Sequence, residues 1–400
     1  MTWCLVGSEM CIRDSGNIWE QKGSQITSSV NPYFNEIKIN SYGNIIAFSN
    51  LNSIYLYEWD SNNQNWQQLG NTIILNDGIV SQSLSISLSE DGKTIAIGNM
   101  DYNIKSSGEI SNIEDVSIGS IKVFKFDGTE WVSKGNSTTI NSYNHNYILD
   151  QGSNKLGKVV NISGDGDILT AVSQVGTVIQ WAWNESSDLW EVRGNRIIGN
   201  SASFGVSKYI ESQSIYSTYD GSIIIIGDYL SGGIGRVYIY EWNNTEFIER
   251  RINLYMNLNN ESFGSAVHIS PKGQYIQIGS SPENNSSYTN SNDQVSKFFK
   301  TYFLEWDGTS YNLVSDNHYY FESDENEFNY SFSDNMNSIM ITSNNYINIY
   351  KYNSDILNSF DFYTKIATLD GPNTFITYKK NNELQSNTNE IKNPFFMDED

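Results

Sequence analysis

The feature that most constrains this chain is a short unit of two strands joined by a tight turn, which recurs along its length. In residues 85–98, Ile86 and Leu88 alternate with serines, and a second apolar run follows at residues 95–97. Alternation with a period of two is typical of a β-strand. Between the two runs, Glu90-Asp91-Gly92 predicts a turn, because glycine adopts the positive φ that a tight hairpin requires. The unit therefore predicts a β-hairpin.

The same hairpin pattern is present five more times, and each copy is followed by two further strands. The five copies span residues 37–49, 160–173, 219–227, 267–279 and 332–343. The third strand of each unit ends on an aromatic residue: Trp59, Phe126, Trp183, Trp242, Trp306 or Tyr352. The fourth strand opens on another: Trp66, Trp131, Trp190, Phe247, Tyr311 or Phe362. Because they occupy one position per unit, we interpret them as core residues between neighbouring units rather than as a sugar-binding surface.

Four antiparallel strands per unit, repeated six times, predict an all-β fold. A β-propeller fits this pattern, since each four-stranded antiparallel blade is covered on both faces by its neighbours. Six complete blades are recognisable, and we expect six or seven in the intact protein. The main alternative is an array of separate β-sandwich domains. Such an array should show Pro- and Gly-rich linkers between its modules, and the sequence has none.

Some of the units carry a further motif built around an aromatic-glycine pair. The stretches with this motif are residues 203–207, followed by Gly227 and residues 235–240, residues 262–270, followed by Gly279, and, in a weaker form, residues 156–160. At the level of pattern, residues 17–378 resemble FG-GAP repeats, the propeller repeats of integrin α-subunits and of many microbial surface proteins. The resemblance implies a propeller with an interaction or adhesion role, placed outside the cell or at its surface.

Calcium is the metal that the sequence favours most. The FG-GAP family carries a calcium loop of alternating Asp residues that ends in Asp-Gly, and this chain approaches it only at Asp165-Gly166-Asp167. Calcium binds six to eight oxygen ligands. We therefore predict Asp165 and Asp167 as candidate calcium ligands, with an ordinary hairpin turn as the alternative explanation. No other cofactor is predicted.

The beginning of the chain is set apart from the repeats. Residues 1–15 resemble the translation of a sequencing adapter, so we interpret them as non-native and assign the propeller domain to residues 16–378. Both cysteines, Cys4 and Cys11, lie in the excluded segment. Residues 17–26 have the pattern of a fourth strand without the preceding three, and propellers often pair such a strand into their last blade.

The end of the chain is also distinct. Residues 365–369 and 373–378 read as two strands that either complete the sixth blade or begin a seventh. Residues 379–400 form a polar, acidic tail that we expect to be disordered.

The charge balance restricts the class of partner. With 46 Asp and Glu against 24 Lys and Arg, the net charge is −22. This excludes nucleic acid as the expected partner, because phosphate binding needs clustered basic residues. No stretch approaches the ~18 apolar residues of a membrane helix. The expected partner is a protein or a carbohydrate at the loops. The longest polar insertions are residues 99–117, 137–153 and 281–296, which are either binding loops or simply mobile.

The sequence contains few of the residue patterns that are typical of a catalytic site. The three histidines, His145, His268 and His318, occupy unlike positions in different units, and no phosphate-binding loop or nucleophile motif is present. We therefore predict a non-catalytic binding, adhesion or protein-interaction propeller, without a catalytic residue. One alternative is a propeller enzyme, a lyase or glycoside hydrolase, with paired carboxylates or histidine at the channel mouth. The other is a structural segment of a longer surface protein.

Overall fold

The computed structural model contains only β-strands and loops in the part of the chain that it describes. Those residues are 2–4, 11–14, 19–24, 26, 36–75, 84–102, 119–135, 140–141, 155–173, 176–197, 215–228, 235–253, 263–280, 297–314, 319–323, 329–332, 338–342, 346–352 and 363–370. The chain divides into two compact units, residues 1–212 with 217–223 and 241–248, and residues 213–216 with 224–240 and 249–400.

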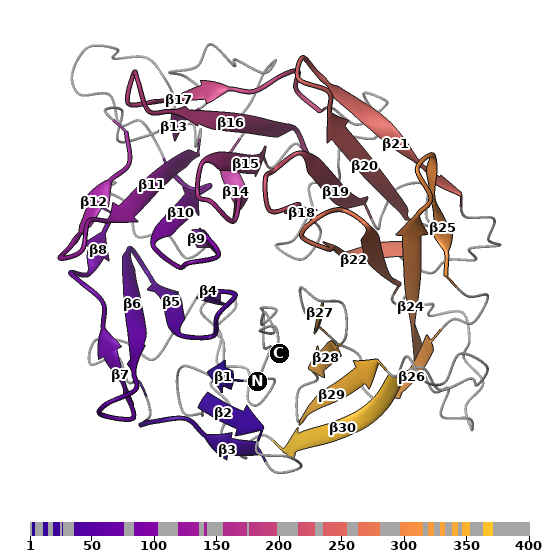
Figure 1. Ribbon diagram of the computed structural model, residues 1–400, viewed down its shortest axis with the longest axis horizontal. Coiled ribbons are helices and arrows are strands. Elements are labelled where there is room, and N and C mark those ends of the chain that lie inside the picture. The colour runs from indigo at the N-terminus through magenta and orange to yellow at the C-terminus, as the bar shows by residue number, and fades with distance from the viewer. Residues whose placement is uncertain are drawn as a thin grey trace, which may run out of the picture. The chain divides into compact units, whose positions relative to one another are not determined.

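The first three blades each consist of four antiparallel strands in sequential order, which lie side by side in Figure 1. The first comprises β4 (Glu36–Ile39), β5 (Ile45–Asn50), β6 (Ser53–Asp60) and β7 (Asn65–Gln68). The second comprises β9 (Leu84–Leu88), β10 (Thr94–Asn99), β11 (Ser120–Phe126) and β12 (Trp131–Ser133). The third comprises β14 (Leu156–Ile162), β15 (Ile168–Ser173), β16 (Val178–Asn184) and β17 (Leu189–Val192). Short strands β8 (Ile73–Ile74) and β13 (Ile140–Asn141) pair with β6 and β11.

Three further blades follow the same strand order. The fourth comprises β18 (Ile215–Ser217), β19 (Ile223–Asp228), β20 (Arg236–Trp242) and β21 (Phe247–Asn253). The fifth comprises β22 (Phe263–Ile269), β23 (Tyr275–Ser280), β24 (Lys297–Trp306) and β25 (Ser310–Leu313), with β26 (Tyr319–Ser323) paired to β24. The sixth comprises β27 (Asn329–Phe332), β28 (Ser338–Thr342), β29 (Tyr346–Tyr352) and β30 (Tyr363–Asp370). The fold is an all-β propeller of four-stranded blades, as the repeat predicts.

The ends of the chain follow the sequence prediction only in part. β3 (Trp19–Gln21) has partners of its own, because it pairs with β2 (Cys11–Asp14), which pairs with β1 (Thr2–Cys4). The expectation of a strand without preceding partners is therefore wrong, although the pairing does not test whether residues 1–15 are native. Residues 365–369 lie in β30 and complete the sixth blade. Residues 373–378, the tail at 379–400 and the insertion at 281–296 lie outside the described residues, as do most of the other two insertions.

The second strand of a blade is buried on both faces. Every residue of β5, β10 and β19 is buried, including the small and polar ones. Alternation of apolar and polar residues is therefore weak in these strands, as expected where neighbouring sheets cover both sides. A run such as Ile223–Asp228, with four consecutive isoleucines, satisfies this environment directly.

The hairpin turns are fixed by side-chain hydrogen bonds. In the second blade, the Ser89 hydroxyl oxygen accepts the backbone N–H of Thr94 at 2.9 Å, and Gly92 adopts a φ of 68°. The same bond joins Ser163 to Ile168 at 2.8 Å in the third blade. The prediction that glycine supplies positive φ in these turns is confirmed. A short polar residue opens the turn because its oxygen replaces a backbone acceptor.

The aromatic residue that opens the fourth strand connects consecutive blades. The indole N–H groups of Trp131 and Trp190 donate to the carbonyl oxygens of Leu69 and Lys134, at 2.9 and 3.0 Å. Both rings are buried. These residues are core residues between blades, as predicted, and their polar atom is satisfied by a buried backbone acceptor.

Candidate functional site

The hairpin turns of four consecutive blades are joined in a chain of hydrogen bonds. The side-chain amide of Asn40 donates to the carbonyl oxygen of Glu90 at 3.2 Å. The backbone N–H of Glu90 donates to Gly164, at 3.0 Å, and that of Gly164 donates to Tyr219, at 2.8 Å. All four residues belong to the first compact unit. We call the turns at residues 40–44, 89–93, 163–167 and 218–222 the turn surface.

Two tyrosines are exposed on the turn surface. Tyr42 is 60% exposed and Tyr219 is 43% exposed. The ring of Tyr219 lies against the backbone of Gly164, since a Cβ atom on that glycine would be 2.0 Å from Cδ2 of the ring. A side chain at position 164 would therefore displace the ring. The neighbouring turn holds Tyr219 in place from one side and leaves much of the ring accessible.

Carboxylates lie beside the Tyr219 ring. Burial raises the pKa of Tyr219, and the negative charges of Glu90 and Asp165 raise it further, together with a hydrogen bond to the Glu90 side chain. Tyr42 contributes in the same direction. The turn surface thus combines two accessible aromatic rings with carboxylates that lie close to one of them. Such a surface can bind a cation by ion pairing and by contact with the ring faces.

The two predicted calcium ligands are engaged with protein donors. Asp165 accepts hydrogen bonds from the Ser163 hydroxyl at 2.5 Å and from the backbone N–H of Asp167 at 3.1 Å. Lys134 forms an ion pair with Asp167 at 2.5 Å and also donates to the Gly166 carbonyl oxygen. A cation at Asp167 would have to displace the Lys134 ammonium group. The described residues contain no group of three or more His, Cys, Asp or Glu placed to hold a metal. Calcium binding at this turn stays a prediction.

His268 lies in the first strand of the fifth blade, as its position in the repeat suggests. It is only 2% exposed, and its ring centroid is 4.8 Å from that of Tyr216. Burial lowers the pKa of His268 to about 3. The side chain is therefore neutral at ordinary pH and belongs to the core. His145 and His318 lie outside the described residues.

Sequence reasoning did not single out Tyr42, Glu90 or Tyr219 as functional residues. A usable signal was present in the register of the turns. When the turns are aligned on their opening residue (Ser89, Ser163 or Thr218), Glu90, Gly164 and Tyr219 occupy the same turn position. Equivalent positions in adjacent blades are expected to be neighbours, which is what the hydrogen bonds between these turns show.

Comparison with known proteins supports the fold and goes no further. No family model matches the chain, and no curated protein matches its sequence. Among solved structures, a candidate 6-phosphogluconolactonase from Bacteroides fragilis has a TM-score of 0.53 at 13% identity, covering 92% of this chain and 94% of its own. A functionally unknown protein from Desulfotomaculum acetoxidans has a TM-score of 0.52 at 11% identity, covering 86% and 88%. A β-propeller domain from Myceliophteria thermophila has a TM-score of 0.47 at 10% identity, covering 84% and 86%. At these identities, the first two structures show a shared fold alone.

Among the described residues, no helix is long and apolar enough to cross a membrane.

Proposed function

We propose that this protein is a non-catalytic interaction propeller whose turn surface binds a basic segment of a partner protein. The observation that carries the proposal is the pair of exposed tyrosines, Tyr42 and Tyr219, with the Glu90 carboxylate beside the second ring. The turns that carry them belong to a series of turns that are hydrogen-bonded from blade to blade. Binding groups that are already ordered lose less conformational entropy when a partner docks.

Charge favours a basic partner. The chain has a net charge of −22, so a Lys- or Arg-rich segment is attracted before contact. At the surface, a cation can pair with Glu90 and lie over the Tyr219 ring. A carbohydrate could stack on the same rings and is the alternative ligand. The carboxylates beside the ring favour the cationic partner, because a cation gains both ion pairing and long-range attraction from their charge, whereas a neutral sugar gains only hydrogen bonds.

The adhesion role belongs to the same proposal. The FG-GAP resemblance supports it, and in two copies of the motif, Leu156-Gly157 and Phe263-Gly264, the glycine has a positive φ and lies against the preceding blade. No family model matches, so the assignment to this repeat type is our inference from these residues. On this proposal, the protein acts outside the cell or at its surface.

Binding to peptides tests the proposal. We expect an oligolysine peptide to bind the wild-type protein, and the double substitution Tyr42→Ala with Tyr219→Ala to weaken its affinity about tenfold, because two cation–ring contacts are lost at constant net charge. Calorimetry or fluorescence anisotropy measures the dissociation constants.

Ile74→Ala is the matched control, since Ile74 is also 60% exposed but lies in β8, away from the turns. Equal affinity in the double variant and the wild type would refute the turn surface as the site. Tyrosine-dependent binding of a neutral oligosaccharide, without binding of the peptide, would favour the carbohydrate alternative.

The alternative that this protein is an enzyme requires a measured catalytic activity. One structural neighbour is named as a candidate 6-phosphogluconolactonase, but at 13% identity its reaction does not transfer to this chain. A lyase or glycoside hydrolase remains the other form of this alternative. Turnover of 6-phosphogluconolactone or of a polysaccharide by the purified wild-type protein, above the uncatalysed rate, would favour an enzyme over an interaction module.

A further inference from the structure

The outer strands of the fourth and fifth blades are joined in a way not seen at the other described junctions. Residues at the end of β21 pair in parallel with β25, in the register Arg251 to Ser310, Ile252 to Tyr311 and Asn253 to Asn312. In the third blade the fourth strand ends at Val192, and Arg193-Gly194 follows. In the fourth blade the equivalent pair is Arg250-Arg251, and the strand continues. An arginine thus replaces the glycine at this junction.

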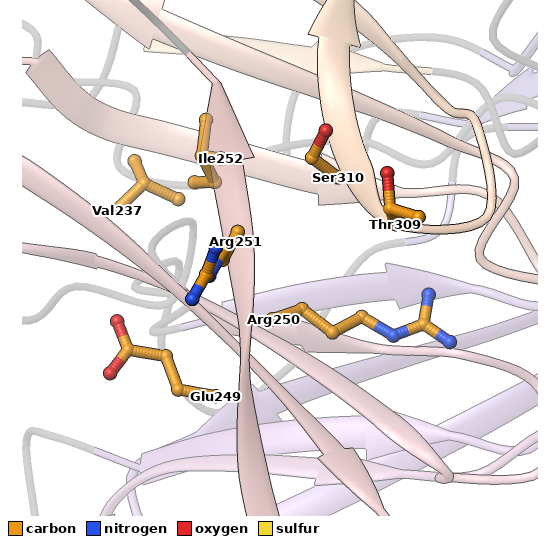
Figure 2. Close-up of a pocket in the computed structure, with 7 residues that line it drawn as sticks. All are labelled: Val237, Glu249, Arg250, Arg251, Ile252, Thr309 and Ser310. Carbon is orange, nitrogen blue, oxygen red and sulfur yellow. The ribbon is translucent and has the colours of Figure 1, made fainter.

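An open pocket lies beside this parallel pairing, entirely within the second compact unit. Its volume is about 800 Å³, and it is lined by Val237, Glu249, Arg250, Arg251, Ile252, Thr309 and Ser310. Figure 2 shows that the Arg250 side chain extends to one side of β21, whereas Glu249 and Arg251 extend to the other, as alternation along a strand requires. The lining contains three charged side chains and two hydroxyl groups.

The two arginines of the pocket differ in how they are held. The guanidinium carbon of Arg250 lies 4.1 Å from the centroid of the Trp306 ring, and the group donates to the Tyr311 hydroxyl oxygen at 3.4 Å. Arg251 is exposed, and its guanidinium group makes no hydrogen bond or ion pair with the described residues. Arg250 therefore has structural contacts, while the donors of Arg251 are directed to solvent and remain available to a ligand.

The acidic groups near Arg251 do not neutralise it. Glu249 lies on the same side of β21 but forms no ion pair with Arg251. Asp307, two residues before Thr309 in the chain, accepts hydrogen bonds from the backbone N–H groups of Thr309 and Ser310 and from the Thr309 hydroxyl. Backbone donation from Ser310, followed by the bonds from Thr309, lowers the pKa of Asp307 to about 2. Asp307 is thus ionised, and its carboxylate oxygens accept hydrogen bonds from donors of the β24–β25 turn.

We propose that the pocket binds the oxyanion of a small carboxylate or phosphate ligand, with Arg251 as the main donor. The planar guanidinium group offers paired N–H donors that match both oxyanions. The Ser310 hydroxyl is the second donor, because its contact with Asn312 Oδ1 is long, at 3.5 Å, and its proton can turn towards a ligand. Glu249 opposes the ligand and limits its affinity. This site shares no residue with the turn surface and does not depend on the function proposed there.

Titration with inorganic phosphate and with succinate tests the site, using the full chain and calorimetry at low ionic strength. We expect saturable binding of one of the two probes at one site per chain. The probe with the lower dissociation constant identifies the class of oxyanion, phosphate or carboxylate. Arg251→Gln should weaken binding at least about tenfold, because it removes a charge-assisted bidentate contact. Glu249→Gln should tighten binding severalfold, because it removes a nearby negative charge.

The matched control is Arg236→Gln, which removes the same charge from an exposed arginine of β20 that does not line the pocket. Its affinity should equal that of the wild type. Equal weakening by Arg236→Gln and Arg251→Gln would overturn the proposal, since general electrostatics would then explain the binding. So would the absence of saturable binding of either probe. If Arg251→Gln fails to fold by circular dichroism, Ser310→Ala replaces it, with a smaller loss of affinity expected.

Discussion

Buried polar side chains of the first strands have structural partners in the next blade. Ser85 and Ser87 alternate with apolar residues, a pattern that in an isolated hairpin would place them towards solvent. In the structure they are 4% and 7% exposed, and their hydroxyl oxygens accept the backbone N–H groups of Val160 and Ile162. In the preceding blade, a Glu36 carboxylate oxygen accepts the N–H of Ile86 at 2.6 Å.

Glu36 also forms a buried ion pair with Lys38 at 3.0 Å. Buried polar atoms need partners because their desolvation is costly. In these blades, the backbone of the next first strand provides many of those partners, so single polar residues help to set the register between blades.

His268 makes the stability of the protein depend on pH. Its pKa falls from an ordinary value of about 6.5 in the unfolded chain to about 3 in the folded one. Between these values the unfolded chain binds a proton that the folded chain does not. The free energy of unfolding therefore falls as the pH drops through this window, by up to about 1.4 kcal/mol per pH unit from this residue.

Chemical denaturation of the wild type and of His268→Gln between the two pKa values measures this contribution. The variant should show a flatter pH dependence, whatever its absolute stability. Tyr216→Phe is the control, because it changes the neighbouring ring without removing the histidine, and it should keep the wild-type slope. Parallel curves for His268→Gln and the wild type would show that the histidine is not responsible.

At the scale of elements, the aromatic-glycine motif marks a close contact between consecutive blades. Gly264 has a φ of 86°, and a Cβ atom on Gly227, in the second strand of the preceding blade, would be 2.1 Å from its carbonyl oxygen. Gly157 and Gly98 repeat the contact between the second and third blades, with 2.2 Å for the equivalent atoms. Both motif strands begin with a register shift, in β14 and in β22. The motif is therefore explained by backbones that approach too closely for any side chain.

Gly227→Ala tests this contact. The φ of Gly227 is not positive, so alanine introduces the steric overlap without a backbone penalty. We expect a loss of about 1–3 kcal/mol in the free energy of unfolding, as for other overpacked sites, measured by urea denaturation. Gly98→Ala should cost a similar amount, because the second copy has the same geometry.

The control for this substitution is Gly128→Ala. Gly128 has a φ of 105° but no heavy atom within 4 Å of the added Cβ, so it reports the backbone cost alone, about 1 kcal/mol. A Gly227→Ala protein as stable as the wild type would mean that the blades can separate slightly at this contact, and that the motif has another cause.

Hairpins and blades could be predicted from the sequence because their determinants are local. Alternation, a turn glycine in five of the six units, and an aromatic residue in both the third and the fourth strand recur along the chain, and the structure follows them. The contacts between blades are harder to predict from the sequence, since they join residues such as Ser85 and Val160 that are far apart in the chain. The turn surface and the arginine pocket belong to this second class. Tyr219 and Arg251 stand where other blades have Glu90 or Gly194, and only the three-dimensional contacts show which substitution at a repeated position creates a site.

At the scale of the whole molecule, charge is the dominant departure from an average protein. Negative charges exceed positive ones by 22. Among the described residues, Glu36, Glu58, Asp101 and Asp167 form ion pairs with lysines. The 22 excess negative charges have no basic counterpart in the chain, so they repel one another. The repulsion favours solubility but opposes compaction, as in proteins of salty surroundings.

Added salt should therefore stabilise the protein. We expect the thermal unfolding midpoint at pH 7 to rise by about 2–5 °C between about 0.01 M and about 0.5 M NaCl, because screening weakens the repulsion among the excess negative charges more than it weakens the ion pairs. Sucrose at equal osmolality controls for solvent exclusion. Near pH 4.4, the isoelectric point of the sequence, the net charge vanishes and the same salt step should have little effect. A midpoint that falls with salt at pH 7 would mean that attraction dominates the folded surface. In that case the excess acidic residues would be clustered in segments whose mutual repulsion does not lower the free energy of unfolding. A basic partner would then be attracted to those segments rather than to the whole molecular surface.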